Sequence, residues 1–271
     1  MTHKHNKELT MQEAFVMQHK RHHHQISAWR GALFVLFLVL WQVSSSLGWI
    51  DGFFFSSPSR VILCFVNQVH KNSMLTHMGI TSFETIVSFF LVLFLSLAVS
   101  TLLWYSRKLS EVLEPYLVVL NSLPKSALAP LFIVWLGTGA TTIIVAGISV
   151  AVFGSIISVY TGFRQVDEEK ITLIYTLGGT KRDAFLKVVL PGSVPILLST
   201  SKVNIGLALV GVIIGEFLAA RRGLGYLIIY GSQVFQLDMV ITSIIVLCVI
   251  ALVFYKSIQF VEHQIKIRFK L

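Results

Sequence analysis

Six long apolar segments constrain the fold of this chain more than any other feature of its sequence. A helix of about 20 residues crosses the roughly 30 Å hydrocarbon core of a bilayer. Stretches that are long and apolar enough occupy residues 31–49, 83–105, 115–136, 141–161, 193–218 and 239–260. Only 13% of the residues are charged, about half the share in soluble domains, and the mean hydropathy is +0.76. We therefore predict an all-α integral membrane protein with six transmembrane helices.

Two proline residues lie inside the third apolar segment. Pro124 and Pro130 lack a backbone N–H and disturb helix geometry, so we expect this segment to be bent or broken. The apolar run at 61–66 is too short to span a bilayer. We predict that it forms an interfacial or re-entrant piece of the first outer loop.

The Lys and Arg residues outside the spans fall mainly on one side of the predicted topology. With the N-terminus inside, the inner segments carry 16 of them and the outer loops carry 4. Because inner loops of membrane proteins are enriched in Lys and Arg, we expect both termini in the cytoplasm and the chain in the inner or plasma membrane. The net charge of +9 then reflects topology, and no nucleic-acid partner is expected.

Residues 1–28 form a polar arm ahead of the transmembrane domain at 29–271. The arm has no signal-peptide pattern, since it lacks a short apolar core and a cleavage site. Its histidines are His3, His5, His19, His22, His23 and His24. These imidazoles could bind a transition metal, or the arm could be a flexible basic tail on anionic lipid, because Lys20 and Arg21 interrupt the cluster. Elsewhere we expect no metal site, since Cys64 and Cys248 lie in apolar runs.

The inner loop at 162–191 is predicted to be structured. Asp167 is a suitable N-cap, and Glu168 and Glu169 follow it where the helix dipole favours acidic side chains. One helical face is then expected from the i, i+3, i+4, i+7 spacing of Ile171, Ile174, Tyr175 and Gly178. The pattern indicates a short helix that begins near Asp167.

A second short helix is predicted after a glycine pair. Gly178 and Gly179 can end the first helix, one of them with a positive φ. Thr180 followed by Asp183 has the spacing of a capping box, and Pro191 is expected to end the helix that follows. The loop therefore predicts two helices that meet at a glycine elbow between two spans.

The same loop resembles a known family. The string TLGGTKRDAFLKVVLPGSVP is similar to the cytoplasmic loop motif of permease subunits in binding-protein-dependent ABC importers, with matches at Gly178, Val188, Leu190 and Pro191. FSSPSRV, LPKSALAPLFIVWLGTG and GEFLAARRGLGYLI extend the resemblance over nearly all of residues 50–260. These sequence motifs are most similar to those of the nitrate, sulfonate, taurine and thiamine-precursor branch of the family. The resemblance implies a type I importer fold.

The chain departs from the family motif at one charged position. Thr172 stands where the family has the glutamate of its E-A-A triplet, and Leu173 and Ile174 replace the alanines. If that glutamate pairs with a basic group on the ATPase, this chain either lacks the pairing or uses Glu168 or Glu169, one turn earlier. Thr200 stands where the family often has glycine.

The chain has none of the motifs that an ATP-hydrolysing enzyme would need. There is no G-x-x-x-x-G-K-[ST] loop to hold nucleotide phosphates, so the chain is not expected to be an enzyme and needs no cofactor of its own. ATP and Mg²⁺ belong to a separate ATPase subunit. The alternative classes are a secondary transporter or channel without an ATPase partner, for which no inverted repeat is found, and a membrane enzyme, for which no nucleophile or metal cluster is found.

The resemblance implies a translocation subunit with several partners. Two identical permease chains would form the path, two ATPase subunits would dock on the 162–191 loops, and an extracytoplasmic solute-binding protein would deliver a small organic anion, such as a sulfonate, or a vitamin precursor. Membrane lipid surrounds the subunit. The residues expected to couple to the ATPase are Asp167, Glu168, Glu169, Ile171, Thr172, Ile174, Tyr175, Gly178, Gly179, Arg182, Leu190 and Pro191.

A second set of residues is expected along the translocation path. Its members are Asn121, Pro124, Ser126, Pro130, Lys202, Gly211, Gly215 and Glu216. Charged residues inside a membrane usually face a cavity or a partner, although Lys202 and Glu216 could instead sit at the inner and outer interfaces. The glycines of the fifth segment suit either a moving gate helix or static close packing.

Overall fold

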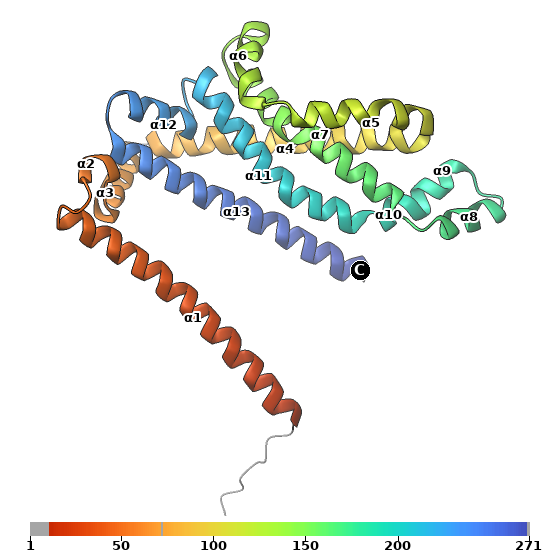
Figure 1. Ribbon diagram of the computed structural model, residues 1–271, viewed down its shortest axis with the longest axis horizontal. Coiled ribbons are helices and arrows are strands. Elements are labelled where there is room, and N and C mark those ends of the chain that lie inside the picture. The colour runs from red at the N-terminus through yellow and green to blue at the C-terminus, as the bar shows by residue number, and fades with distance from the viewer. Residues whose placement is uncertain (1–10, 72, 270–271) are drawn as a thin grey trace, which may run out of the picture. The chain divides into compact units, whose positions relative to one another are not determined.

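The computed structural model describes residues 11–71 and 73–269, and the elements in these ranges are helices (Figure 1). They are α1 (Met11–Ser46), α2 (Gly52–Phe55), α3 (Pro58–His70), α4 (Ser73–Tyr105), α5 (Arg107–Ser122), α6 (Lys125–Leu136), α7 (Ala140–Arg164), α8 (Glu168–Thr176), α9 (Lys181–Ala184), the π-helical η1 (Phe185–Val189), α10 (Leu190–Gly192), α11 (Val194–Ala219), α12 (Leu224–Gln233) and α13 (Leu237–Phe269). The chain divides into two compact units, Met1–Leu63 and Cys64–Leu271, and each is described by itself.

The first unit is built on the long helix α1. Its apolar part, Ala28–Ser46, is long enough to cross a membrane. The chain then turns through α2, which Asp51 caps by accepting a hydrogen bond from the Phe53 N–H at 2.8 Å. Trp41 Nε1 of α1 donates a hydrogen bond to the Phe55 carbonyl of α2 at 3.2 Å. His3 and His5 of the predicted arm lie outside the described residues, and the side chains of the arm's other histidines are likewise not described.

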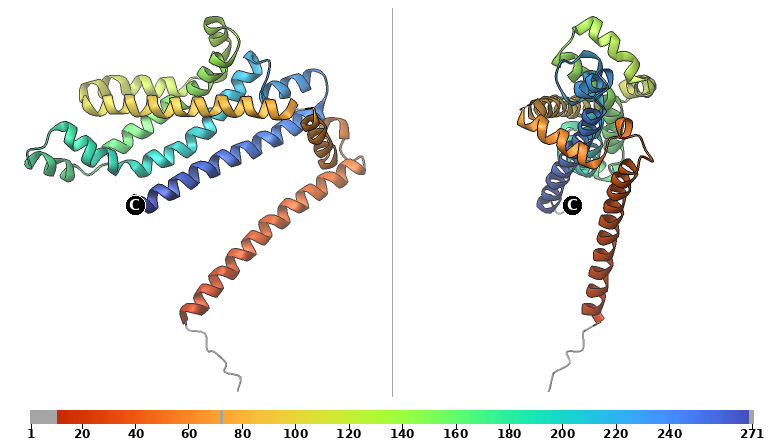
Figure 2. Two further views of the ribbon diagram at one scale, coloured as in Figure 1. Left: turned by 180° about the vertical axis from the view of Figure 1, so that it is seen from behind. Right: turned by 90° about the vertical axis from the view of Figure 1, so that its left-hand side faces the viewer.

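Helices α4, α7 and α11 form the centre of the second unit, with α12 and α13 packed beside α11 (Figure 2). Serine hydroxyls and amides join the helices where they meet. Ser100 Oγ donates to the Ile156 carbonyl at 2.9 Å, and Asn204 Nδ2 donates to Ser155 Oγ at 2.7 Å. Such hydrogen bonds replace the hydrophobic force that is missing between helices in lipid.

Glycines set the close contact between α7 and α11. A Cβ on Gly211 would lie 2.7 Å from the Ala146 carbonyl oxygen, and one on Gly215 would lie 2.9 Å from Ile143 Cα. Gly206, on the same helix, has open space around it. Close packing is therefore built into α11 at Gly211 and Gly215, and not at Gly206.

The third predicted span is broken. Helices α5 and α6 meet at a 95° bend because Leu123 and Pro124 leave the helical conformation. The Lys125 ammonium donates hydrogen bonds to carbonyls beside the break, at 3.0 Å from both Asn121 O and Leu123 O, and it also donates to Leu120 O. Pro130 lies inside α6 without ending it. The expected bend is confirmed, and Pro124 is its site.

The helices confirm the predicted spans but not their limits. Five single helices are long and apolar enough to cross a membrane, and six spans result if the bent pair counts as one. The second span begins at Ser73 and the last continues to Phe269, several residues beyond the apolar stretches, because a helix can continue where its side chains become polar. The run at 61–66 lies in the 13-residue helix α3.

Candidate functional site

The connection between α7 and α11 is the most structured loop of the second unit. Asp167 caps α8 by accepting a hydrogen bond from the Glu169 N–H at 2.9 Å. Glu168 and Glu169 fill the first turn and are exposed. Thr172, which stands at the family's glutamate position, is exposed and donates its hydroxyl to the Glu168 carbonyl at 2.9 Å. The predicted N-cap is confirmed.

The two glycines of the elbow have different physical roles. Gly178 has a φ of +79° and open space around it, so the backbone conformation explains the glycine there. Gly179 has no room for a side chain, since a Cβ would lie 2.5 Å from Ile174 Cγ2 and 2.8 Å from the Ile174 carbonyl oxygen. The predicted elbow is confirmed, with positive φ and close approach divided between the two residues.

Helix α9 begins with the predicted capping box. The Asp183 carboxylate accepts the Thr180 N–H at 3.0 Å, and Thr180 Oγ1 accepts the Asp183 N–H at 3.3 Å. Lys187 forms an ion pair with Asp183 at 2.8 Å. The Lys187 ammonium, together with the hydrogen bonds from Thr180, holds the pKa of Asp183 well below its usual range.

Pro191 does not end the second helix, which corrects the prediction. The helix widens into the π-helical turn η1 and continues through Leu190 and Pro191 to Gly192. In this turn the Leu190 N–H bonds the Phe185 carbonyl. Pro191 then occupies the first turn of α10, where its missing N–H costs little.

Aromatic contacts fix this loop to the ends of two spanning helices. The Phe185 ring lies 5.1 Å from the Trp104 ring of α4 and 5.4 Å from the Phe163 ring of α7, measured between centroids. Lys181 Nζ donates to the Tyr105 carbonyl at 2.8 Å and lies 5.4 Å from the Trp104 ring centroid. Phe185 and Phe163 are buried. Helix α9 and η1 are therefore in direct contact with the ends of α4 and α7.

The apolar side chains that are exposed on α8 and just after it differ from the helical face that the i, i+3, i+4, i+7 spacing predicted. Ile171 and Ile174 are half-buried, and Ile171 packs against the cluster around Phe163 and Phe185. Tyr175 is 44% exposed, but the most exposed apolar side chains are Leu173 at 57% and Leu177 at 76%. Leu173 and Leu177 are one helical turn apart, so their i, i+4 spacing could have identified them as a second face.

The remaining predicted residues of the loop lie at its surface or its end. Arg182 and Pro191 are exposed, and Leu190 is half-buried against the cluster of Phe163 and Phe185. The described part of the chain contains no group of three or more His, Cys, Asp or Glu side chains placed to hold a metal ion.

The residues predicted along a translocation path fall into two groups. Asn121, Pro124, Ser126 and Pro130 are exposed around the break between α5 and α6. Their neighbour Ala129, which shares this stretch of α6, is buried at 2% exposure. This first group is thus gathered at one structural feature, whereas the second group lies on α11.

The charged residues of α11 are held by other helices. Lys202 Nζ lies 2.8 Å from Glu262 Oε2 of α13. Glu216 is buried and accepts hydrogen bonds from Thr81 Oγ1 at 2.7 Å and from the Gly225 N–H at 2.6 Å. Arg221 and Arg222, which lie near Glu216 in the sequence, are exposed. Sequence reasoning did not identify Thr81 or Glu262, because neither partner is marked by a local pattern.

The second unit thus combines helices long enough to span a membrane with a capped helical connection between α7 and α11. Residues 93–267 match the family described as "Binding-protein-dependent transport system inner membrane component". The chain belongs to this family, and it is the membrane-spanning permease subunit of an ABC importer, not an enzyme. It is a multi-pass inner-membrane protein, and membership implies an ATPase and a solute-binding protein as partners. The secondary transporter, the channel and the membrane enzyme are thereby excluded.

Several known proteins are similar to this chain over most of their length. A "Probable ABC transporter permease protein" of Haemophilus influenzae is 30% identical over 84% of this chain and 92% of its own. The formylaminopyrimidine transport permease protein ThiX of Halalkalibacterium halodurans is 25% identical, with 71% and 76% covered. The taurine transport system permease protein TauC of Escherichia coli is 23% identical, with 89% of each covered.

A solved structure confirms the fold. The inward-facing MetNI methionine ABC transporter contains a chain that superposes with a TM-score of 0.62 at 20% sequence identity. The match covers 74% of this chain and 98% of that one. The second unit therefore has the fold of type I ABC importer permeases, as the loop motif predicts.

Proposed function

We propose that the α7–α11 connection, residues 162–191, is the surface on which the ATPase docks and through which it moves the spanning helices. Three features support this. The loop is capped at both helix starts, it presents exposed Leu173, Tyr175 and Leu177, and aromatic contacts tie it to α4 and α7. Exposed apolar side chains on a rigid polar loop are typical of a partner surface.

The residues proposed for docking take distinct roles. Leu173, Tyr175 and Leu177 enter an apolar groove of the partner. Glu168, Glu169 and Arg182 form the charged rim of the docking surface on this chain. Thr172 is not ionisable, so any acidic contact of the family triplet is made by Glu168 or Glu169. Gly178, Gly179, Leu190, Pro191 and the half-buried Ile171 and Ile174 hold the shape of the loop.

The proposed assembly contains two copies of this chain. One chain supplies the helices for half of a two-fold path, so a homodimer with two ATPase subunits completes it. Both chain ends then lie in the cytoplasm, the side favoured by the distribution of Lys and Arg. ATP-driven closure of the ATPases brings the two loops together and rocks the helices, which is alternating access by rigid-body movement.

The proposed path runs past the break between α5 and α6. Asn121, Pro124, Ser126 and Pro130 line it there, because they are the exposed polar or helix-breaking residues of this stretch. Lys202, Gly211, Gly215 and Glu216 act on the path indirectly by fixing α11 against α4, α7 and α13. The substrate is proposed to be a small organic anion such as a sulfonate, or a vitamin precursor, in line with the names of the similar permeases.

The docking proposal is tested by Leu177→Asp in the assembled importer. Leu177 is 76% exposed, so the change adds a charge to the surface without opening the core. We expect ATPase subunits to be lost from the purified complex, and stimulation of ATP hydrolysis by the loaded binding protein to fall in liposomes. Leu109→Asp, a partly exposed leucine of α5, is the matched control. Unchanged retention and stimulation in Leu177→Asp would overturn the proposal.

A further inference from the structure

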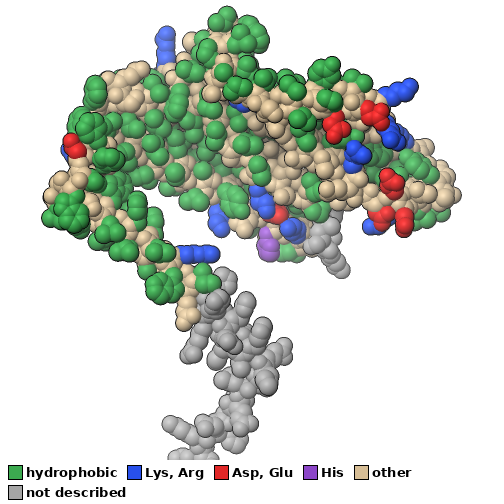
Figure 3. Space-filling view, in the orientation of Figure 1, with side chains coloured by type: hydrophobic (Ala, Val, Ile, Leu, Met, Phe, Trp, Pro, Cys, Tyr) green, Lys and Arg blue, Asp and Glu red, His purple; other side chains and the backbone are tan. Residues whose placement is uncertain are grey.

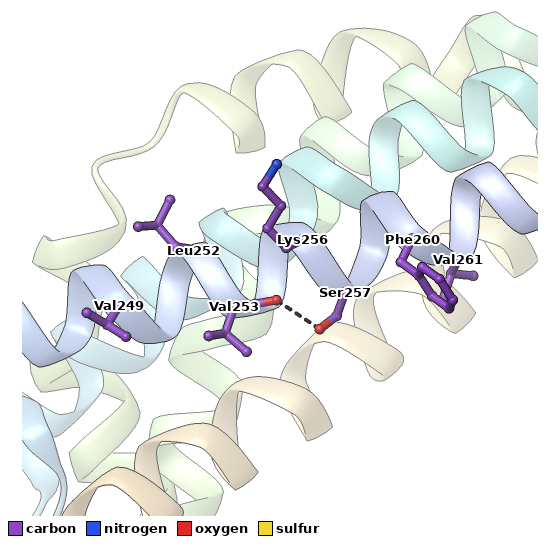
Figure 4. A pocket seen from close by; sticks show the side chains of 7 residues that line it. All are labelled: Val249, Leu252, Val253, Lys256, Ser257, Phe260 and Val261. Carbon is purple, nitrogen blue, oxygen red and sulfur yellow. Dashed lines mark hydrogen bonds between the residues drawn. The ribbon is translucent and has the colours of Figure 1, made fainter. Parts of the chain in front are cut away.

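Two adjoining hollows lie along the C-terminal half of α13. The first has a volume of about 590 Å³ and is lined by Val249, Leu252, Val253, Lys256, Ser257, Phe260 and Val261 (Figure 4). Six of these side chains carry no charge, and Ser257 Oγ is occupied by its own helix, at 2.8 Å from the Val253 carbonyl. The first hollow is therefore a shallow apolar groove on the surface of α13, open to its surroundings, with Lys256 as its single cationic side chain.

The second hollow is basic and shares Lys256 and Phe260 with the first. It has a volume of about 610 Å³ and is also lined by Lys202, Gln259, Glu262, His263 and Lys266. Basic side chains and a histidine gather over this part of the molecule (Figure 3). An apolar groove and a basic hollow thus form one continuous surface on α13.

The charges of the basic hollow do not cancel. Glu262 is its one acidic side chain, and both carboxylate oxygens are used: Oε2 lies 2.8 Å from Lys202 Nζ and Oε1 lies 2.9 Å from Lys266 Nζ. Lys256 bonds a neutral group, Gln259 Oε1, at 3.2 Å. Three ammonium groups therefore face one carboxylate, which leaves a positive excess centred on Lys256.

The position of Lys256 along α13 fits the boundary between hydrocarbon and head groups. Helix α13 has 33 residues, about 50 Å at 1.5 Å per residue, which exceeds the roughly 30 Å hydrocarbon core. From Met239 to Tyr255 the helix carries no charged residue, and from Lys256 onward it carries Glu262, Lys266 and Arg268. The part of the apolar groove that precedes Lys256 therefore lies at acyl-chain depth, and the basic hollow lies at head-group depth.

We propose that these two hollows bind one anionic phospholipid. An acyl chain lies along Val249, Leu252 and Val253, and the phosphate accepts hydrogen bonds from Lys256, with Lys202 and Lys266 adding positive potential. A free soluble anion would leave the apolar groove unused. A second copy of this chain related by two-fold symmetry would bring its lysines against these lysines, which is unfavourable. The site holds α11 and α13 together at one membrane face, independently of ATPase docking.

The test is lipid binding by the full-length permease in detergent, measured by native mass spectrometry against added phosphatidylglycerol or phosphatidylcholine. A lysine near a membrane surface adds roughly 1 kcal/mol of attraction to anionic lipid, which is about a five-fold change in affinity. We expect Lys256→Gln to weaken phosphatidylglycerol binding about five-fold, and Lys256→Arg to retain it. Lys108→Gln, which removes an exposed lysine of α5, is the matched control and should have no effect.

Four outcomes of the lipid-binding measurements would overturn the proposal. They are equal binding of both lipids by the unchanged protein, no loss in Lys256→Gln, the same loss in Lys108→Gln, and displacement of the lipid by inorganic phosphate alone. Disulfide formation between two Val253→Cys chains would do so as well, because it would show a second copy on this face. None of these readouts depends on the ATPase, so a failed docking proposal would leave this one standing.

Discussion

The hydroxyl of Thr81 on α4 donates a hydrogen bond to Glu216 Oε1 on α11 at 2.7 Å. The same oxygen of Thr81 accepts the Leu224 N–H at 2.8 Å, and Glu216 Oε2 accepts the Gly225 N–H at 2.6 Å. Two buried side chains thereby join two spanning helices to the first turn of α12. His77, one helical turn from Thr81, extends the contact by accepting the Gly223 N–H at 2.8 Å.

Thr81→Val should destabilise the protein, although the valine side chain is about as large as the threonine that it replaces. The valine leaves the buried Leu224 N–H and Glu216 Oε1 each without this partner, and an unsatisfied buried polar group costs about 1–3 kcal/mol. We expect a clearly lower midpoint of thermal unfolding in detergent, followed by intrinsic fluorescence. Thr101→Val is the control, since that hydroxyl only bonds the Leu97 carbonyl of its own helix at 2.7 Å. Equal midpoints for the two variants would contradict this account.

Gly211→Ala and Gly206→Ala should have opposite effects on the same helix. A Cβ at position 211 would lie 2.7 Å from both the Ala146 oxygen and Gly147 Cα, and these backbone atoms cannot move aside without separating α7 from α11. Overpacking of this kind costs about 1–3 kcal/mol. Alanine at 206 meets open space and improves helix propensity by about 0.5–1 kcal/mol. The check is the thermal midpoint of each variant, and a Gly211→Ala protein as stable as the parent would refute the close contact.

The cap of α9 should be insensitive to pH between 5 and 8. Because Lys187 and Thr180 lower the pKa of Asp183, the stability this carboxylate contributes is present above its ordinary pKa of about 3.9. It is lost only as the pH falls through the lower, folded-state pKa. Asp183→Asn should therefore reduce hydrogen-exchange protection of the 181–187 amides a few-fold, and by the same factor at pH 5 and pH 8. A factor that shrinks toward pH 5 would show that Asp183 titrates there.

Cysteines at two positions of α6, just after the α5–α6 break, should differ in reactivity. Ser126 is exposed, whereas Ala129 is 2% exposed. Ser126→Cys should react with a water-soluble maleimide in the reconstituted importer, and the rate should change when ATP is added, because the proposed path opens and closes there. Ala129→Cys is the internal control and should stay inert. A Ser126→Cys that is unreactive in every nucleotide state would place the path elsewhere.

Local patterns in the sequence were sufficient for much of the fold. Apolar runs predicted the spans, since a helix is the structure that satisfies every backbone group inside a bilayer. Pro124 and Pro130 together predicted a bent or broken span, Asp167 and Thr180 predicted two helix starts, and the glycine pair predicted the elbow. Each of these signals acts through neighbouring residues of the chain, within about one helical turn, so it can be read without knowledge of the partners.

Pairings between distant segments could not be predicted in this way. Glu216 and Lys202 stand out in the sequence as charges within a span, but Thr81 and Glu262, which hold them, carry no local mark. The contact of Gly211 with α7, in contrast to the open surroundings of Gly206, depends on how two helices cross. The i, i+4 spacing of Leu173 and Leu177 marks a helical face, but that this face is the exposed one depends on the packing of Ile171 against Phe163 and Phe185.

The sequence by itself therefore determined the membrane class, the spans, the break in the third span and the capped loop, because hydropathy, caps and turn residues act locally. The tertiary structure alone decided which charges pair, which glycines are in contact, that the helix at Pro191 continues through a π-turn, and that α13 carries an apolar groove beside a basic hollow. These depend on distances between residues such as Lys202 and Glu262, which lie far apart in the chain and meet only after the helices pack.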